Sequence, residues 1–415
     1  MILTPPLIYI ALPVMNEMER LPLLIKAILE QTQQSFRLVI CVNQPDSWWD
    51  DPEHICVCEE NQLTIQYMQS LDDNRIEIID RSSPGNGWPP KGYGIGIARK
   101  LLMDLISKVA NTDDIIISMD ADTVFGNEYF ASVAENLRIN PAASAIAVPY
   151  YHKLSYNEEL DRAMLRYEIY MRAFAINMWR IRNPYSFTAL GSAIAMPVWA
   201  YKASGGMTPK LSGEDFYFLQ KIVKTGRLLH WNSEIVFPAT RLSNRVFFGT
   251  GPALIKGIAG DWSSYPIYNY RIFDLVAETS KAFGALYKKD LATPLDNFLI
   301  AKFGELPWKG LRNNFKTQAH FIRACHEKID GLRILQFLKE NQPGDEKVSE
   351  SALSELLQLY KNQFPEIITD LNTKVDFGLS PVTDLNFTRD VLFEIEMHYR
   401  KMHWNDFTGL TVLYN

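Results

Sequence analysis

The stretch Asp113-Asp-Ile-Ile-Ile-Ser-Met-Asp-Ala-Asp-Thr-Val124 decides the fold that we predict for this chain. Residues 115–119 form a short, unbroken apolar run that is rich in β-branched side chains, a pattern typical of a parallel strand buried on both faces. Asp120 and Asp122 follow this run directly, although an unpaired carboxylate is costly to desolvate. At the carboxyl end of a parallel strand, both would face the crevice in which open α/β sheets bind ligands.

The spacing of Asp120 and Asp122 indicates a cation site. Side chains two residues apart in an extended chain point to the same side. Paired carboxylate oxygens suit a hard divalent cation, which typically holds a phosphate-bearing substrate. A second interpretation stays open at this stage, in which Asp122 caps a turn or short helix and Asp120 is simply solvated.

Strands and helices alternate on both sides of this stretch, which predicts an α/β fold with a mostly parallel sheet flanked by helices. Beyond about Tyr265, strand-like runs vanish and helical periodicity continues to about Lys401. We therefore expect a catalytic domain over residues 1–265 and a mainly α-helical region over residues 266–415. The expected strands are 7–12, 37–42, 76–79, 115–119, 143–148, 192–196 and 228–236, and the expected helices of the first domain are 21–31, 61–71, 97–109, 128–137, 157–182 and 212–225.

The bulk composition is ordinary for a soluble globular protein, with 47% hydrophobic and 22% charged residues. The net charge of -6 argues against wholesale binding of nucleic acid. The four cysteines lack zinc-site spacing, which favours reduced thiols in a cytosolic protein. The sequence shows neither a signal peptide nor an apolar window of the ~18 residues that a membrane span needs. We expect a cytoplasmic protein and leave open a peripheral contact with the inner face of a membrane.

Pro13, Asn16 and Glu17 lie at the carboxyl end of the first expected strand, on the same rim of the sheet as Asp120. The amide and carboxylate there are suited to hold a nucleotide base or ribose by hydrogen bonds. The alternative is a turn followed by the acidic first turn of the next helix.

A glycine-rich loop that leads into the helix expected at 97–109 contains Lys91 and Gly94, and Arg99 follows within the helix. Glycines let the backbone approach a ligand closely, and a helix N-terminus favours anions. The spacing matches neither the Rossmann fingerprint nor a Walker loop.

Two further groups complete the candidate site. Glu214 and Asp215 open a helix, where a carboxylate in the cleft is suited to act as a general base. The alternative is an acidic capping box between Ser212 and Asp215. Arg241 and Arg245, four residues apart beside a glycine-containing loop, are suited to clamp a diphosphate, unless they belong to a solvated surface loop.

Taken in chain order, these residues resemble a family 2 glycosyltransferase of the Rossmann-like GT-A fold. The resemblance covers roughly residues 7 to 250, and nothing comparable covers the helical C-terminal part. The matching parts are Pro13 with Asn16-Glu17, the glycine-rich loop with Ala98-Arg99, Asp120-Ala-Asp122, Gly205-Gly206 and Glu214-Asp215.

The resemblance implies an inverting, hexosyltransferase-type enzyme with a nucleotide-sugar donor and a divalent metal, Mn²⁺ or Mg²⁺. By similarity, Asp122 would ligate the metal and Asp120 would lie beside it, near ribose and diphosphate. Asp215 would deprotonate the acceptor hydroxyl, with Glu214 as the neighbouring candidate for this role. The acceptor would be a glycan, a lipid-linked molecule or a small molecule, and the Gly205-Gly206 turn lies where it could enter.

The chain departs from the family pattern at the end of the second strand. Many members carry an Asp-Asp pair there, one acid of which reads the base, whereas this chain has Asn43-Gln44. The identity of the nucleotide is therefore open. The Gln-x-x-Arg-Trp motif of processive synthases is absent, which favours a single-addition enzyme. No third metal ligand is evident, and His230 is more typical of a satisfied structural residue.

Two other functions compete with this interpretation. A nucleotidyltransferase shares a related sheet and an acidic metal site, but it normally carries a basic glycine-rich loop after the first strand. A non-catalytic sugar-nucleotide-binding protein would have no need for all three of Asp120, Asp122 and Asp215.

Overall fold

The computed structural model describes residues 6–90, 92–210, 213–243, 249–342, 344–369 and 371–402. The chain divides into two compact units. The first contains residues 1–153, 189–222 and 228–252, and the second contains residues 154–188, 223–227 and 253–415. The predicted boundary near residue 265 stays a prediction.

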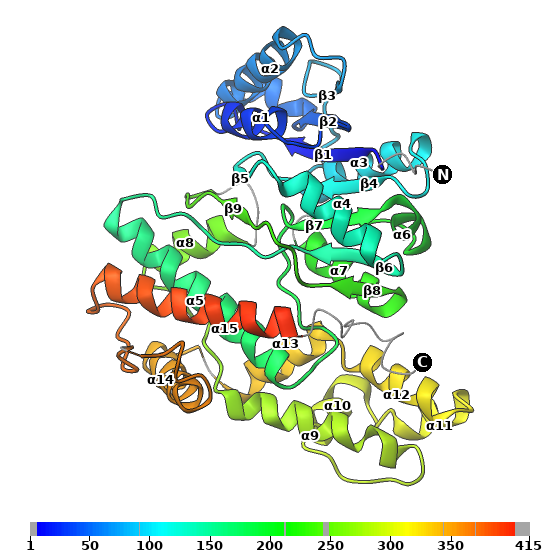
Figure 1. Cartoon of the computed structure of the whole chain (residues 1–415), viewed down its shortest axis with the longest axis vertical. Coiled ribbons are helices and arrows are strands. Elements are labelled where there is room, and N and C mark those ends of the chain that lie inside the picture. The colour runs from blue at the N-terminus through cyan, green and yellow to red at the C-terminus, as the bar shows by residue number, and fades with distance from the viewer. Residues whose placement is uncertain are drawn as a thin grey trace. The chain divides into compact units, whose positions relative to one another are not determined.

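The first unit is built on a seven-stranded sheet in the order β3-β2-β1-β4-β7-β6-β8, which Figure 1 shows from edge to edge. Strands β1, β2, β3 and β4 are parallel, and β7 pairs antiparallel with both β4 and β6. The strands of this sheet are β1 Ile8–Val14, β2 Phe36–Asn43, β3 Ile76–Arg81, β4 Ile115–Ser118, β6 Ala143–Ala147, β7 Ile194–Pro197 and β8 Arg227–Leu229.

Helices pack on this sheet. Helix α3 contacts β1, β2 and β4, while α4 and α6 contact β6 and β7. The helices that lie wholly or partly in the first unit are α1 Leu21–Leu29, α2 Ile55–Ser70, α3 Ile95–Val109, α4 Tyr129–Ile139, α6 Val198–Ala203, α7 Glu214–Thr225 and α8 Thr250–Ile258, together with a 3-10 turn, η1 Asp46–Asp50. The predicted class, a mostly parallel sheet flanked by helices, is confirmed.

The centre of the sheet is as apolar as the sequence predicts. Every residue of β1 and β4 is buried, and Met119 is fully buried beyond the end of β4. Asp114 fixes the start of β4, because its carboxylate accepts hydrogen bonds from the backbone N–H of Leu7 at 3.0 Å and of Asn111 at 2.8 Å. This register places Asp120 and Asp122 just beyond the carboxyl end of β4.

The expected strand over residues 228–236 is wrong. This part of the chain instead contains two short strands, β8 and β9 Val236–Pro238. Strand β9 pairs antiparallel with β5 Thr123–Phe125 in a separate two-stranded sheet. The polar segment between β8 and β9 is held against α4 instead, since Asn136 Nδ2 donates to Trp231 O at 2.6 Å and Asn232 Nδ2 donates to Ser132 Oγ at 2.9 Å.

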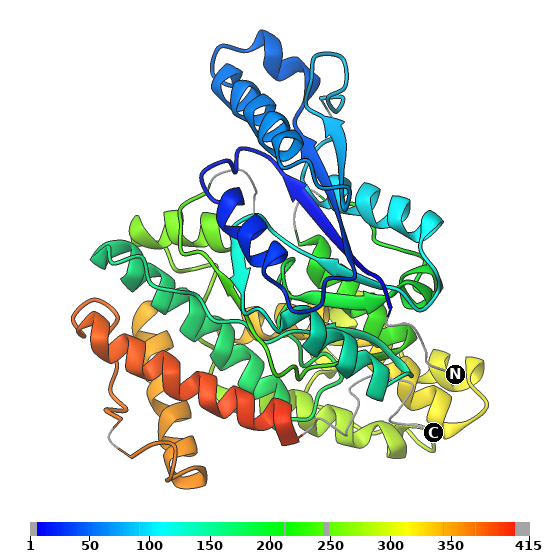
Figure 2. The same ribbon diagram turned by 45° about the horizontal axis from the view of Figure 1, so that its top comes forward.

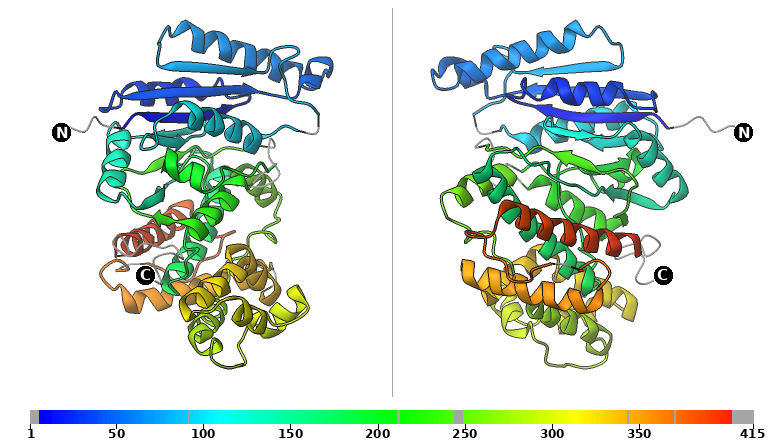
Figure 3. Two further views of the ribbon diagram at one scale, coloured as in Figure 1. Left: turned by 90° about the vertical axis from the view of Figure 1, so that its right-hand side faces the viewer. Right: turned by 60° about the vertical axis from the view of Figure 1, so that its left-hand side comes forward.

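The second unit is helical, as predicted for the C-terminal region. All regular elements that the structure describes between residues 259 and 402 are helices. Helix α15 runs alongside α5 in Figures 1 and 2, and α14 lies next to α15 in Figure 3. The helices that lie wholly in this unit are α5 Glu158–Arg180, α9 Tyr270–Leu286, α10 Asp296–Phe303, α11 Trp308–Asn314, α12 Gln318–Lys328, α13 Gly331–Asn341, α14 Glu346–Gln363 and α15 Val382–Met402.

A buried ionic cluster joins α5 to α15. The side chains of Arg172, Glu168 and Glu396 are at most 1% exposed. Arg172 is paired with Glu168 one helical turn away and, at 2.7 Å, with Glu396 of α15. Arg389 and Arg400 bind the same two carboxylates at 3.3 and 2.8 Å. Because buried charges are tolerated only when paired, this cluster fixes the register between the two helices.

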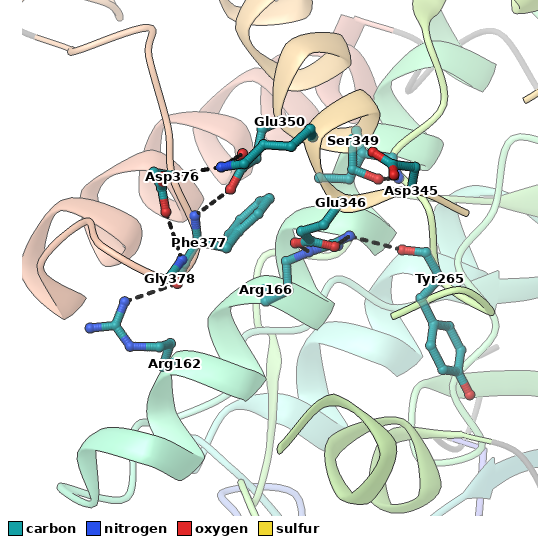
Figure 4. A network of polar contacts seen from close by, with 12 residues as sticks. Arg162, Arg166, Tyr265, Asp345, Glu346, Ser349, Glu350, Asp376, Phe377 and Gly378 are labelled. Atoms are coloured by element: carbon teal, nitrogen blue, oxygen red, sulfur yellow. Dashed lines mark hydrogen bonds and ion pairs between the residues drawn. The ribbon is translucent and has the colours of Figure 1, made fainter. Parts of the chain in front are cut away.

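A second polar network joins α5 to α14 and to the segment before α15 (Figure 4). Arg166 pairs with Glu346 at 2.8 Å, and its guanidinium lies over the ring of Phe377. Arg162 donates to Phe377 O at 3.0 Å, and Glu350 accepts from Phe377 N at 2.9 Å. Arg162, Arg166 and Arg172 of α5 thus hold elements of this helical unit together.

No helix in the described part of the chain is both long and apolar enough to span a bilayer.

Arg172→Met is expected to lower the free energy of unfolding by ~3–5 kcal/mol, because it leaves Glu168 and Glu396 buried with less compensating charge. Arg138→Met is the matched control, since Arg138 and its partner Glu135 are 68% and 56% exposed. Such an exposed pair contributes ~0–1 kcal/mol. Urea unfolding of both variants checks this, and equal losses would contradict the role given to the cluster.

Candidate functional site

A pocket of about 200 Å³ lies in the first unit, beyond the carboxyl ends of β1, β2 and β4. Asp120 and Asp122 line it together with Glu17 and Arg241. The other lining residues are Pro13, Val14, Met15, Asn43, Ile95, Ala121, His152, Leu190, Ser192, Pro238, Ala239, Ser243, Thr250 and Gly251. Predicted site residues that lie far apart in the sequence, from Glu17 to Arg241, thus meet at one rim of the sheet.

Arg241 bridges two acids in this pocket. Its Nε lies 2.7 Å from Asp122 Oδ2, and its Nη2 lies 2.5 Å from Glu17 Oε1. The short β5–β9 sheet brings these groups together, because Asp122 directly precedes β5 and Arg241 follows β9. Burial favours the neutral form of Arg241, but the charges of Asp122 and Glu17 outweigh it and raise the pKa of the guanidinium.

Arg99 connects Asp120 to the start of α7. The Arg99 side chain is 1% exposed, and its Nη2 lies 2.7 Å from Asp120 Oδ1 while its Nε lies 3.2 Å from Glu214 Oε1. Its Nη1 donates to the Ser118 hydroxyl and, at 3.0 Å, to Gly191 O. Arg99 was predicted to bind substrate, but it is not among the described lining residues of the pocket. Its contacts are those of a residue that positions two acids.

Two glycines make room for this arrangement. A Cβ on Gly191 would lie 2.5 Å from Arg99 Nη2, and a Cβ on Gly96 would lie 2.3 Å from Lys210 O. The first glycine therefore leaves space for the buried guanidinium. The second lets the first turn of α3 approach the chain that leads into α7.

Glu214 and Asp215 have different surroundings. Glu214 is buried and its carboxylate is engaged by Arg99. Asp215 retains partial exposure as a residue, and its Oδ1 accepts from Phe216 N at 2.7 Å. Burial of the carboxyl group, followed by the charge of Glu214, raises the pKa of Asp215 to about 7. Neither acid is among the described lining residues, and Arg99 links Glu214 to Asp120 of the pocket.

The residues at or just after the ends of β1 and β2 that were predicted to bind substrate are only partly at the pocket. Pro13 and Asn43 line it, but both ends of the Asn43 amide are used internally. Asn43 Nδ2 donates to Val14 O at 2.9 Å, and Asn43 Oδ1 accepts from Trp88 Nε1 at 3.1 Å. Asn16 does not belong to the described lining, and its backbone N–H donates to Asn61 Oδ1 at 2.9 Å.

The predicted glycines shape the backbone around the site. Gly94 precedes α3 with a φ of 126°, which an L side chain rarely adopts. Gly205 and Gly206 form a left-handed turn with φ of 73° and 69°, outside the described lining. Lys221 fixes this turn by donating to Gly206 O at 2.7 Å. Lys91, Arg245 and the proposed capping residue Ser212 lie outside the described residues.

Sequence reasoning missed His152, which lines the pocket and is fully buried. Its position five residues after the end of β6 was the only local signal for it. Sequence reasoning also missed Ser118 and Gly191 as the partners of Arg99. His230, considered as a metal ligand, is buried just after β8 and is not part of the described lining.

The carboxylates of Asp120 and Asp122 fit a divalent cation that binds together with a ligand. Each uses one oxygen in its arginine pair, Asp120 Oδ1 and Asp122 Oδ2. Across the described ranges, no group of three or more His, Cys, Asp or Glu side chains is placed to hold a metal. A cation such as Mg²⁺ is commonly held by one or two carboxylates and completes its shell with substrate phosphates and water.

No protein-family model matches this chain, and no curated protein sequence matches it. The matches are to solved structures. The crystal structure of S. aureus TarS 1–349 in complex with UDP-GlcNAc is 14% identical, with 95% of this chain and 92% of that chain covered and a TM-score of 0.40.

Two other solved structures are similar at the same level. The mannosyltransferase PcManGT from Pyrobaculum calidifontis in complex with GDP-Man and Mn²⁺ is 13% identical over 79% of this chain and 88% of that chain, with a TM-score of 0.38. GalNAc-T7 with UDP, GalNAc and Mn²⁺ is 12% identical over 79% of this chain and 58% of that chain, with a TM-score of 0.39. At these values the comparisons assign neither a family nor a function.

Gly191→Ala is expected to disturb the Arg99–Asp120 pair, because the new Cβ would lie 2.5 Å from Arg99 Nη2. The expected loss in the free energy of unfolding is ~1–3 kcal/mol, the usual cost of overpacking. Gly310→Ala is the control, since a Cβ on this helical glycine meets no atom within 4 Å. That change should be neutral or stabilise by up to ~1 kcal/mol. Equal stability of the two variants in denaturant unfolding would show that the space at Gly191 is not needed.

Proposed function

We propose that this protein is a family 2 glycosyltransferase of the GT-A fold, which transfers a hexose from a nucleotide sugar to an acceptor hydroxyl with inversion. The observation that carries the proposal is the pocket at the carboxyl ends of β1 and β4. It combines Asp120, Asp122 and Arg241, and Arg99 connects Asp120 to Glu214. The next residue is Asp215, whose pKa is raised by burial to about 7. Diphosphate binding, leaving-group stabilisation and proton removal are the three tasks of such a transfer.

Charge supports a role for a divalent cation. The described lining holds three carboxylates, those of Glu17, Asp120 and Asp122, against the one guanidinium of Arg241. A nucleoside diphosphate adds further negative charge, which this lining alone would repel. Asp120 and Asp122 would hold the cation, which would supply Lewis-acid stabilisation for the charge of the departing diphosphate. The acceptor is a glycan, a lipid-linked molecule or a small molecule that presents a hydroxyl.

Asp215 is the proposed general base. Displacement at the anomeric carbon needs a nucleophile stronger than a neutral hydroxyl, so the base removes the acceptor proton as the bond forms. A base is most effective when its pKa is near the working pH, and burial raises the pKa of Asp215 to about 7. Glu214 is less suited, because its carboxylate is engaged by Arg99.

The direct test is a transfer assay with a panel of nucleotide sugars and hydroxyl-bearing acceptors. Mass spectrometry would detect the glycosylated product, and the release of nucleoside diphosphate would be measured in parallel. Slow hydrolysis of one donor without acceptor would also support the proposal. If the protein instead attached nucleotides to sugar phosphates and released pyrophosphate, it would be a nucleotidyltransferase.

Asp215→Asn is expected to lower kcat by ~10²–10⁴-fold while donor binding persists, because a positioned base typically contributes this factor. In the wild-type enzyme, kcat/KM should fall as the pH drops below about 7, since Asp215 is then protonated. The variant should lack this acid limb. A pH–rate profile of both proteins checks the assignment.

Stability separates this role from helix capping. A carboxyl group whose pKa is raised in the folded state destabilises that state as the pH rises from about 4 toward 7. Asp215→Asn should therefore leave the Tm at pH 8 unchanged or higher. A capping role alone predicts a small loss of stability, ~1 kcal/mol or less, together with normal turnover, because Asn keeps most of the capping ability of Asp. If Glu214→Gln abolished turnover and Asp215→Asn did not, the base would be Glu214.

Removal of divalent cations is expected to weaken the binding of nucleoside diphosphates by at least about tenfold, which corresponds to ~1.4 kcal/mol. Asp122→Asn should show no such difference between Mn²⁺ and chelator. Titration calorimetry with a panel of nucleoside diphosphates checks both expectations and also identifies the nucleobase that the protein prefers. Equal wild-type affinity with Mn²⁺ and with chelator would rule out the role of the metal.

A further inference from the structure

Arg241 forms an ion pair with Asp122, the carboxylate that the proposed cation would bind. Its Nε is 2.7 Å from Asp122 Oδ2, and only 18% of the Asp122 side chain is exposed. The other arm of the guanidinium is held by Glu17, whose side chain is 8% exposed. Arg241 itself is 23% exposed, so this bridge lies largely out of solvent and is stronger than an ordinary surface pair.

Arg241 and a divalent cation would repel one another at Asp122. A guanidinium remains charged at any pH that the protein tolerates, so Arg241 cannot give way by losing a proton. Two cations within a few ångströms of each other in a pocket of low dielectric repel strongly. When a cation binds Asp122, the guanidinium must therefore weaken its contact with that carboxylate or move away from it.

The displaced guanidinium would have a suitable partner. Arginine binds phosphate oxygens with two parallel N–H donors, a geometry that matches a diphosphate. Arg241 lies in the pocket lining beside Asp122, where the proposed function places the diphosphate. The same side chain is thus suited first to neutralise Asp122 and later to neutralise the ligand.

We propose that Arg241 acts as an exchangeable counter-ion, which leaves Asp122 when a divalent cation binds there and then binds the diphosphate of the donor. This inference rests on the proposed function and assigns Arg241 a positioning role that the sequence pattern did not give it. Such an exchange makes the binding of the two ligands cooperative. The cation frees Arg241 to bind the nucleotide, and the nucleotide holds Arg241 away from Asp122, where it would compete with the cation.

Two simpler roles make different predictions. If Arg241 only binds phosphate, its removal weakens nucleotide binding and leaves the affinity for the cation unchanged. If Arg241 only holds the loop after β9 to Glu17, its removal lowers stability and changes neither affinity in a specific way. The exchange of counter-ions predicts opposite effects on the two ligands, which neither of these two roles does.

The test measures Mn²⁺ binding to the nucleotide-free protein, from the electron paramagnetic resonance signal of free Mn²⁺. Arg241→Gln should bind Mn²⁺ about tenfold or more tightly than the wild type, since it removes the competing charge. The same variant should bind a nucleoside diphosphate about tenfold or more weakly in saturating Mn²⁺. Arg241→Lys keeps the charge without the fork of donors and should have an intermediate Mn²⁺ affinity.

Arg138→Gln is the matched control, because Arg138 forms an exposed ion pair on α4 with Glu135, and neither residue lines the pocket. It should leave both affinities unchanged. Thermal unfolding of each variant verifies that it is folded. If Arg241→Gln does not fold, the Mn²⁺ affinity of Arg241→Lys is compared with that of the wild type instead. An unchanged or weaker Mn²⁺ affinity in the Arg241 variants would overturn the inference. The inference would also be overturned if neither the wild type nor the variants bound Mn²⁺ measurably at millimolar concentration.

The outcomes separate this inference from the proposed function. If the wild type binds nucleotide with Mn²⁺ but the Arg241 variants gain no Mn²⁺ affinity, the exchange is wrong and the proposed function stands. If the wild type binds neither Mn²⁺ nor any nucleoside diphosphate, both are wrong.

Discussion

A single buried guanidinium, that of Arg99, links the parts of this site. It is shared between Asp120, at the end of the central strand, and Glu214, at the start of α7. An unpaired charge at that depth would be unstable, so the two acids and the guanidinium hold one another in place. Gly191 leaves the space that this contact needs, and Ser118 supplies a further hydrogen-bonding partner. The position of Asp215 follows from the same contact, because it adjoins Glu214 at the first turn of the helix.

Charge balance explains why the acids are divided in this way. Glu17 and Asp122 share Arg241, while Asp120 and Glu214 share Arg99. Asp215 is left without an arginine in direct contact among the described ion pairs, and burial together with the neighbouring Glu214 raises its pKa to about 7. The four paired acids are thereby held in place by the two arginines. The fifth is available for proton transfer near neutral pH, which is the division that the proposed transfer requires.

The sequence predicted the parts of this arrangement that depend on local patterns. The apolar run of residues 115–119 predicted a parallel strand buried on both faces, and Asp120 and Asp122 were expected at its carboxyl end because strand direction alone places them there. The role of Arg99 could not be predicted, since its partner Glu214 is 115 residues away and no periodicity connects the two. Arg241 was expected at the site, but its bridge to Glu17 and Asp122 depends on the pairing of β5 with β9. The single strand expected over residues 228–236 hid that pairing.

A crystal structure of the protein with a nucleoside diphosphate and Mn²⁺ would show whether this pocket is the donor site. We expect the diphosphate to lie in the pocket lined by Asp120, Asp122 and Arg241, with the anomalous signal of manganese at the Asp122 carboxylate. Asp215 should remain free of the metal on the side from which an acceptor approaches. A nucleotide bound elsewhere on the protein, or a pocket that stays empty at saturating ligand concentration, would show that this pocket is not the donor site.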